Sequence, residues 1–256
     1  MSNTLRIHVC QTAPCWENPS SSLDYIENLI SGIETDLLIL PEFFSTGFSM
    51  NPACSESAEG PTFQWMMKTS AAIGGAVAGS LPVIENGHHY NRFYFCKPDG
   101  SWEHYDKKHI FTIGEESKTY APGSEIKIVT WRGWRIRLST CYDLRFPVWL
   151  RNKALEYDLL LNVAAWPSTR IGVTDVLIRA RAIENQCYAI FCNRTGNEPT
   201  LAYNGGSSVI DFKGESILRP NFGAQMLLAT SLELDKLHAF REKFPVWKDQ
   251  DDFLLR

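Results

Sequence analysis

The sequence predicts an α/β fold with mixed parallel and antiparallel sheets, and three observations support this. Apolar runs of strand length alternate with helix-length segments that have one apolar and one polar face. Two further segments have the pattern of β-hairpins, so part of the sheet structure must be antiparallel. No linker rich in proline, glycine or serine divides the chain. We therefore expect one domain spanning residues 1–256.

The N-terminal part supplies three strands and two helices. Residues 5–13 and 71–84 are largely apolar, and DLLIL at 36–40 is a nearly continuous apolar run, which is typical of a strand buried on both faces. Residues 20–34 and 61–70 have mixed faces and helical length. This alternation of strands and helices is typical of an α/β fold.

The middle of the chain contains the two hairpins. YNRFYFCKPDGSWEHY at 90–105 places an Asp-Gly turn after an aromatic strand over 90–96. KIVTWRGWRIRLST at 127–140 places an Arg-Gly turn before the strand 134–140. These hairpins require a mixed sheet.

In the C-terminal part of the chain, predicted strands again alternate with predicted helices. Strands are predicted at 157–165, 187–193 and 207–212, and helices at 147–156 and 174–186, where Pro147 suits the first turn of the earlier helix. Residues 235–256 are charged with interspersed aromatic residues. They fit either a C-terminal arm at a subunit interface or a partly ordered tail.

The composition excludes several classes of function. A formal charge of −4 and no basic run longer than Lys107-Lys108-His109 argue against nucleic-acid binding. The N-terminus lacks a signal-peptide pattern and no apolar run is long enough to span a membrane, so we expect a cytoplasmic protein. Seven cysteines without a CxxC pair favour neither disulfides nor a zinc site, and no nucleotide-binding glycine motif is present. We expect no cofactor and no metal.

Cys141 is the best candidate nucleophile among the seven cysteines. It follows the strand 134–140 and precedes the turn that leads to Pro147. A corner between a strand and a helix exposes the side chain and presents backbone N–H groups, which favour a thiolate and a developing oxyanion. Most cysteines only fill apolar space, so this position distinguishes Cys141 from the others.

Two more polar residues follow predicted strands. Glu42 comes directly after the buried run 36–40, where burial would raise its pKa towards that of a general base; the alternative is a surface residue in a loop. Lys107 follows the aromatic hairpin and precedes apolar residues, so it is a candidate oxyanion donor. It is otherwise one half of a solvated lysine pair.

The segments LPEFF, YDKKHIF and STCYDLRFP, in this order, resemble those of the nitrilase or carbon–nitrogen hydrolase superfamily. The resemblance implies a catalytic triad of Glu42, Lys107 and Cys141. It also implies a second active-site glutamate, for which we choose Glu116 over its neighbour Glu115. The implied fold is a four-layer α-β-β-α sandwich of two mixed sheets, which usually forms a homodimer or a higher homo-oligomer.

Within the superfamily, these segments look most similar to the ω-amidase branch, which implies hydrolysis of a 2-oxo dicarboxylic acid monoamide such as α-ketoglutaramate through a thioester. Arg145 is suited to grip the substrate carboxylate, unless it forms an ion pair with Asp143 or Glu184. The aromatic residues closest to these motifs are candidate walls of a narrow pocket: Phe43, Tyr142 and Trp166. Asn193 and Arg194 follow another strand, without an assigned role.

Other functions remain open at this stage. A deaminated-glutathione amidase, an aliphatic amidase, an N-carbamoylase or a nitrilase would share the triad and differ in pocket shape. A papain-like hydrolase would use His109 as its base, although the sequence lacks the motifs of such enzymes. A non-catalytic binding protein with the same fold is the alternative from a different class.

Overall fold

Two β-sheets form the centre of the protein in the computed structural model, which describes residues 3–219 and 222–255. The first sheet has seven strands in the order β15-β1-β2-β4-β5-β6, with β3 beside β4. β1, β2 and β4 are parallel, and the outer strands β15, β5 and β6 are antiparallel to their neighbours. Its strands are β1 Thr4–Gln11, β2 Leu37–Ile39, β3 Glu56–Ser57, β4 Ala76–Glu85, β5 His88–Cys96, β6 Trp102–Asp106 and β15 Met226–Glu233.

The second sheet has six strands in the order β14-β13-β10-β9-β8-β7. β8, β9 and β10 are parallel, and β7 and β13 run antiparallel to them. A separate pair, β11 with β12, extends from this region. These strands are β7 Ile128–Trp131, β8 Trp134–Thr140, β9 Leu159–Ala164, β10 Tyr188–Asn193, β11 Thr195–Asn197, β12 Ala202–Asn204, β13 Ser208–Ile210 and β14 Ser216–Leu218.

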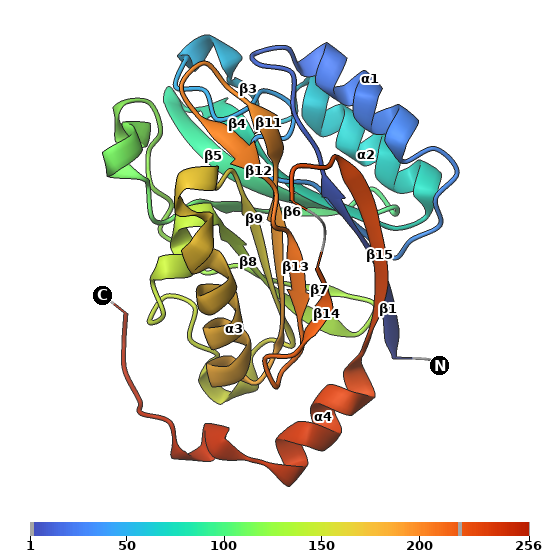
Figure 1. The fold of residues 1–256 in the computed structure, drawn as a ribbon, viewed down its shortest axis with the longest axis vertical. Coiled ribbons are helices and arrows are strands. Elements are labelled where there is room, and N and C mark those ends of the chain that lie inside the picture. Colours follow the sequence, from blue (N-terminus) through green and yellow to red (C-terminus); the bar gives the residue numbers. More distant parts are fainter. Residues whose placement is uncertain (1–2, 220–221, 256) are drawn as a thin grey trace.

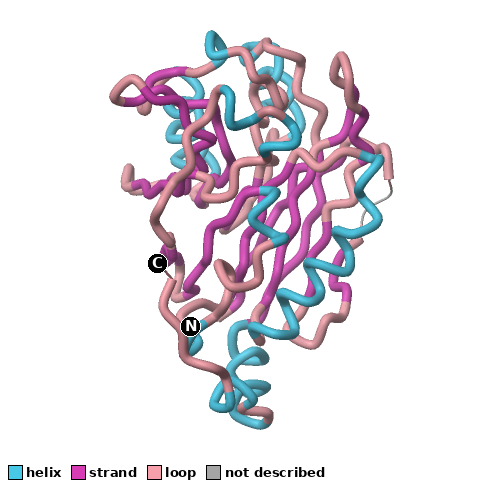
Figure 2. Tube along the Cα trace, turned by 90° about the vertical axis from the view of Figure 1, so that its left-hand side faces the viewer, coloured by secondary structure: helices cyan, strands magenta, loops and turns pink. Residues whose placement is uncertain are grey.

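Helices cover the outer faces of both sheets. α1 (Pro19–Leu29) and α2 (Pro61–Ile73) lie side by side against the first sheet, and α3 (Thr174–Asn185) packs on β10 and β13 of the second (Figure 1). Figure 2 shows the strands running side by side with a helix along them. The layers follow the order helix, sheet, sheet, helix, which confirms the predicted four-layer sandwich.

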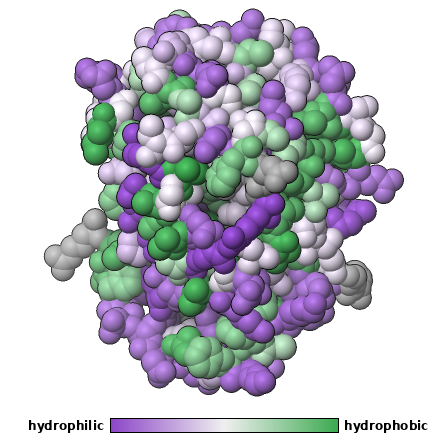
Figure 3. Space-filling model, in the orientation of Figure 1, coloured by the Kyte–Doolittle hydropathy of each residue, from purple (hydrophilic) through white to green (hydrophobic). Residues whose placement is uncertain are grey.

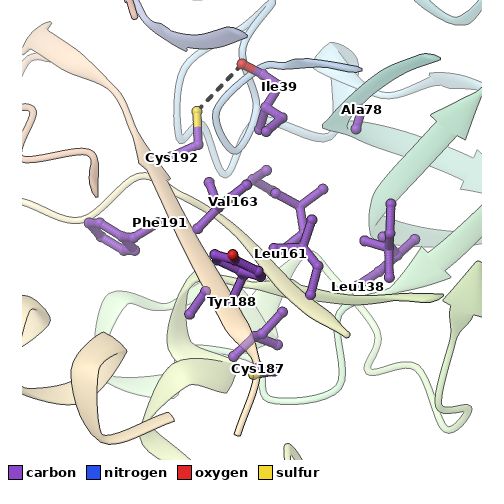
Figure 4. Packing of buried hydrophobic residues seen from close by; sticks show 14 of the residues in the cluster. Ile39, Ala78, Leu138, Leu161, Val163, Cys187, Tyr188, Phe191 and Cys192 are labelled. Atoms are coloured by element: carbon purple, nitrogen blue, oxygen red, sulfur yellow. Dashed lines mark hydrogen bonds between the residues drawn. The ribbon is translucent and has the colours of Figure 1, made fainter. Parts of the chain in front are cut away.

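The largest apolar core lies between the sheets, and strand alternation creates it. Leu5, Ile7 and Val9 of β1 belong to this central cluster, whereas Cys10 packs with the helices on the other face. Figure 4 shows side chains from both sheets meeting there, including Ile39 from one and Leu161 from the other. Close packing of the sheets fixes the ends of the strands relative to each other.

Local signals set most helix boundaries. Asn18 caps α1 by accepting a hydrogen bond from the Ser21 amide, and Pro19 occupies the first turn. α2 ends at Gly74, which has a left-handed φ of 63°. The predicted strand 71–84 was therefore wrong over its first residues, which complete α2.

The predicted helix 147–156 is also wrong. This segment is irregular apart from a short 3-10 helix, Lys153–Leu155, in which Ala154 and Leu155 have positive φ. The buried Asn152 side chain donates to the carbonyls of Tyr157 and Asn185 and so stabilises the irregular backbone. Tertiary hydrogen bonds outweigh the helical pattern here.

The C-terminal segment, residues 235–256, lies against its own chain as far as the structure describes it. In α4 (Leu234–Lys243), the Arg241 side chain donates a hydrogen bond to Asp158 Oδ1 at 2.7 Å. After α4, the Phe253 carbonyl accepts a hydrogen bond from Lys153 Nζ at 2.7 Å. Figure 1 shows this red segment passing below the sheets. Arg241 and Phe253 thus connect this segment to the rest of the chain.

Hydrophilic groups cover much of the face seen in Figure 1, with hydrophobic groups among them (Figure 3). None of the helices within residues 3–219 and 222–255 combines the length and apolar character that crossing a bilayer requires.

Candidate active site

Two segments that follow strands, and the 3-10 helix Glu116–Lys118, bring ionisable side chains together. Glu42 follows β2, and Lys107 follows β6. Lys107 Nζ donates to Glu42 Oε1 at 2.9 Å, and to both carboxylate oxygens of Glu116 at 3.0 and 2.9 Å. All three side chains are fully buried. Glu115, by contrast, is exposed and pairs with Lys118, so Glu116 is the glutamate that contacts the ammonium group.

The Glu42 carboxylate has a hydrogen-bond donor on each side. Oε1 also accepts from Asn91 Nδ2 at 2.7 Å, and Oε2 accepts from the Ala165 amide at 2.7 Å. Asn91 donates a second bond to Glu116 at 3.0 Å. These bonds fix the orientation of Glu42 and hold the two carboxylates on either side of Lys107.

Cys141 occupies a sharp corner after β8. Its φ is +44°, and it begins a 3-10 helix, Cys141–Arg145, which ends before Pro147. The predicted corner therefore exists, but a 3-10 turn replaces the expected helix. The Tyr142 amide lies in the first turn, where backbone N–H groups have no partner within a helix. It is thus a candidate oxyanion donor next to the thiol.

Asp143 connects this corner to the lysine segment. Its carboxylate accepts from the Thr140 amide at 2.9 Å and from the Tyr105 hydroxyl at 2.7 Å. It also accepts from the His109 amide at 2.9 Å. One buried carboxylate therefore couples the position of Cys141 to that of Lys107.

The charges of the cluster favour a resting thiol beside a charged lysine. Burial raises the pKa of Cys141 well above its ordinary value, and the Glu42 carboxylate raises it further. Burial lowers the pKa of Lys107, but Glu116 and Glu42 outweigh this and raise it overall. The pKa of Glu116 is raised, first by burial and then by the like charge of Glu42. Proton transfer from the thiol to a neighbouring carboxylate leaves the net charge of the cluster unchanged.

Cys141 and Lys107 face a cavity of about 360 Å³. Its walls are largely apolar and aromatic, with a few polar groups, as in most small-molecule sites. The apolar and aromatic lining includes Trp16, Phe48, Met50, Phe111, Tyr142, Ala165, Trp166, Pro167, Leu201 and Tyr203. A thiol and an ammonium group in the lining of such a cavity, with a buried carboxylate bonded to the ammonium group, can carry out nucleophilic attack on a small carbonyl compound.

Similarity to a known protein family extends over nearly the whole sequence. The sequence profile described as carbon-nitrogen hydrolase matches residues 6–242. The chain belongs to the carbon–nitrogen hydrolase family.

Two curated relatives and one solved structure illustrate the similarity. Omega-amidase YafV of Yersinia enterocolitica is 41% identical, and the alignment covers 99% of each chain. The 2-oxoglutaramate amidase of Bacillus subtilis is 33% identical, with 84% of each chain covered. A crystal structure of a CN-hydrolase superfamily protein from Xanthomonas campestris, with an arsenic adduct in its active site, has a TM-score of 0.96 at 39% identity and 99% coverage of both chains.

Of the predicted pocket residues of this carbon–nitrogen hydrolase, all but Phe43 line the cavity. Arg145 lines the cavity, with its Cζ 5.0 Å from the centroid of the Trp166 ring. Tyr142 is in the wall, where it meets Phe111 edge to face. Phe43 is fully buried and does not line the cavity, which corrects the prediction of substrate contact; it packs behind Phe48, a wall residue, at 5.9 Å between ring centroids.

The proposed ion pairs of Arg145 do not form. Asp143 contacts His109, and Glu184 pairs with Arg181 at 2.9 Å. The Arg145 guanidinium is thus left for the cavity.

His109 does not contact the cavity. Its ring stacks on Phe146 with centroids 3.7 Å apart, and Nδ1 lies 2.7 Å from Asp143 Oδ1. His109 therefore binds Asp143 and does not face the cavity, which disfavours a papain-like role as the base for Cys141.

Three residues outside the predicted site support it. Asn91 contacts both glutamates, as described above. Asn193 accepts from the Trp166 amide at 2.7 Å and donates to the Trp166 carbonyl at 3.0 Å, so it fixes that wall. Arg194 is buried and pairs with Glu198, which lines the cavity. A polar residue within or at the end of a buried strand was the only sequence signal for these positions.

Within the described residues, no group of three or more histidine, cysteine, aspartate or glutamate side chains is arranged to hold a metal ion.

Proposed function

We propose that this carbon–nitrogen hydrolase is an ω-amidase, which releases ammonia from the side-chain amide of a 2-oxo dicarboxylic acid monoamide such as 2-oxoglutaramate. The observation that carries the proposal is a buried Glu-Lys-Cys cluster whose lysine and cysteine line a small cavity that also has arginine in its lining. Relatives named as ω-amidase and 2-oxoglutaramate amidase, at 41% and 33% identity, support the same substrate class. The required substrates are the amide and water.

In the proposed mechanism, Glu42 accepts the proton of Cys141 while the sulfur attacks the amide carbon. Lys107 and the Tyr142 amide stabilise the tetrahedral oxyanion. Glu42 then gives the proton to the leaving nitrogen, the carbon–nitrogen bond breaks, and ammonia leaves a thioester on Cys141. Water, deprotonated by Glu42, attacks the thioester, and the carboxylic acid product leaves as the thiol is reprotonated.

Glu116 and Asn91 act on this mechanism through Lys107 and Glu42. Glu116 accepts two bonds from Lys107, which keeps the ammonium group charged and directed towards the oxyanion. The Asn91 amide binds both carboxylates and reduces their repulsion. In this proposal neither residue exchanges a proton with the substrate.

Arg145 binds the substrate carboxylate. It is the last residue of the 3-10 helix that Cys141 begins, so the nucleophile and the guanidinium are held by one rigid turn. Its stacking on Trp166 leaves the N–H edge of the guanidinium available for two parallel hydrogen bonds. Tyr142 and Trp166 enclose the carbon chain between these groups.

The decisive experiment compares wild type with Cys141→Ala on 2-oxoglutaramate. We expect the variant to lose ammonia release and keep its thermal transition, and we expect mass spectrometry of acid-quenched wild type to find an acyl group on Cys141. A fully buried cysteine that does not line the cavity, Cys96, provides the matched control as Cys96→Ala. Ammonia release by the Cys141→Ala protein at the wild-type rate would refute the proposal.

A panel of amides separates this proposal from the other specificities of the family. It contains 2-oxoglutaramate, deaminated glutathione, an aliphatic amide, an N-carbamoyl amino acid and an aromatic nitrile. We expect the highest kcat/KM for 2-oxoglutaramate, because the cavity is small and its arginine matches one carboxylate. A higher value for any other member would reassign the substrate, and no turnover of any member would favour a binding protein.

We also propose that the chain is one cytoplasmic domain that forms a homodimer, with residues 235–256 at or near the subunit interface. Apolar side chains exposed on and before α3 support a contact: Val173, Val176 and Ile183 are 40%, 67% and 52% exposed. Light scattering coupled to size exclusion should give twice the chain mass of 29.0 kDa. A monomer at micromolar concentration would contradict the dimer.

A further inference from the structure

A second arginine, Arg170, also lines the cavity. Its Cζ lies 5.1 Å from the centroid of Phe111, much as Arg145 lies over Trp166. The Arg170 carbonyl accepts a hydrogen bond from Trp166 Nε1 at 3.0 Å, so the backbone that carries this arginine is tied to the cavity wall. Both guanidinium groups thus rest on aromatic faces and keep their N–H groups available.

Neither arginine has its charge compensated. Within the part of the chain that the structure describes, no carboxylate lies in salt-bridge range of Arg145 or Arg170. The third cation of the lining, Lys107, is paired with two buried carboxylates. Arg145 and Arg170 are therefore the two lining cations that have no carboxylate partner among the described residues.

The acidic residues of the lining are already engaged. Glu198 pairs with Arg194, and its two oxygens also accept from the Phe48 amide at 2.7 Å and the Tyr203 hydroxyl at 2.7 Å. Glu115 is exposed and pairs with Lys118 at 2.6 Å. The cavity is thus built to receive negative charge and lone pairs, and it offers no free carboxylate to a cationic group.

We propose that Arg170 is a specificity-determining residue that selects 2-oxo acid amides over 2-amino acid amides. This inference rests on the proposed ω-amidase function and deepens it. One substrate carboxylate needs one bidentate arginine, which Arg145 supplies next to the nucleophile. The charge of Arg170 is then left for the neighbouring carbon, where a 2-oxo oxygen accepts a hydrogen bond and a 2-ammonium group is repelled.

The two classes of compound differ only at that carbon. 2-Oxoglutaramate and L-glutamine share the carboxylate, the chain length and the reactive amide. Chain length and carboxylate binding therefore cannot separate them, whereas a cation beside the second carbon does. An enzyme that ignored this difference would hydrolyse an abundant amino acid.

The test measures kcat/KM for 2-oxoglutaramate and the inhibition constant of L-glutamine against it, in wild type, Arg170→Gln, Arg170→Lys and Arg170→Glu. Arg170 is exposed, so these variants should fold, and thermal melting checks this. The matched control is Arg132→Gln, which removes an exposed arginine that stacks on Trp131 outside the cavity.

For Arg170→Gln we expect kcat/KM to fall about tenfold, mainly through KM, and the inhibition constant of glutamine to fall about tenfold or more. Arg170→Glu should bind glutamine more tightly still, and Arg170→Lys should keep most of the discrimination because it keeps the charge. Arg132→Gln should match wild type.

The inference is overturned if neither Arg170→Gln nor Arg170→Glu tightens glutamine inhibition while wild type hydrolyses 2-oxoglutaramate. If wild type does not hydrolyse 2-oxoglutaramate, the proposed function fails first, and the inference fails with it. The two failures are therefore distinguished by the wild-type reaction alone.

Discussion

Glu42→Gln is the substitution that most directly tests the role of a carboxylate base. Glutamine keeps the size of the side chain but loses the charge and the ability to accept a proton. In the protein, one carboxylate oxygen accepts from Lys107 and Asn91, and the other accepts from the Ala165 amide at 2.7 Å. Because every neighbour is a donor, the NH₂ group of glutamine must face a donor in either orientation.

The size of the effect follows from these contacts. Loss of general-base catalysis costs about 10²- to 10⁴-fold in kcat, or roughly 3 to 5 kcal/mol of transition-state stabilisation. One buried donor without an acceptor costs about 1 to 3 kcal/mol of folding stability. We therefore expect a large fall in kcat, a small change in KM and a modest decrease in the unfolding midpoint.

The assay is continuous ammonia release from saturating 2-oxoglutaramate, with urea unfolding followed in parallel. Glu34→Gln is the matched control, because Glu34 is 89% exposed and lies outside the cavity. A folded Glu42→Gln protein that kept more than a tenth of the wild-type kcat would refute the role of Glu42 as the base.

Three further predictions concern positioning and stability. Asp143→Asn should lower kcat more than tenfold with little change in KM, since the carboxylate holds the Cys141 and Lys107 segments together; equal loss in both parameters would contradict this. Leu161→Ala, at a fully buried position of the central core, should cost about 2 to 5 kcal/mol in urea unfolding. The pKa of Asp158 lies below its ordinary 3.8, because hydrogen bonds from arginines outweigh the opposing effect of burial. The ion pairs of Asp158 thus stabilise the fold at pH values above 3.8, and they lose this effect as the pH falls through the lower pKa that Asp158 has in the folded protein. Asp158→Asn should therefore lower the melting temperature at pH 6, with a difference from wild type that shrinks towards pH 3.

The sequence by itself determined the type of fold and indicated the candidate catalytic residues. Glu42, Lys107 and Cys141 each follow a strand that hydrophobic periodicity identifies, and periodicity is a local property that a single sequence records. The hairpins were equally local, because Asp-Gly and Arg-Gly turns between alternating residues specify them. The resemblance of the three segments to a known family then supplied their order and roles.

Only the tertiary structure decided which neighbours complete the site. Asn91 lies 49 residues from Glu42 along the chain, and its bond to that carboxylate depends on how β5 packs in the sheet. The contact of Glu116 with Lys107, the burial of Phe43 and the place of Arg170 in the cavity have the same origin. So does the absence of the predicted helix at 147–156. Each is fixed by contacts between distant segments, whose free energy exceeds the local preferences that a sequence pattern can express.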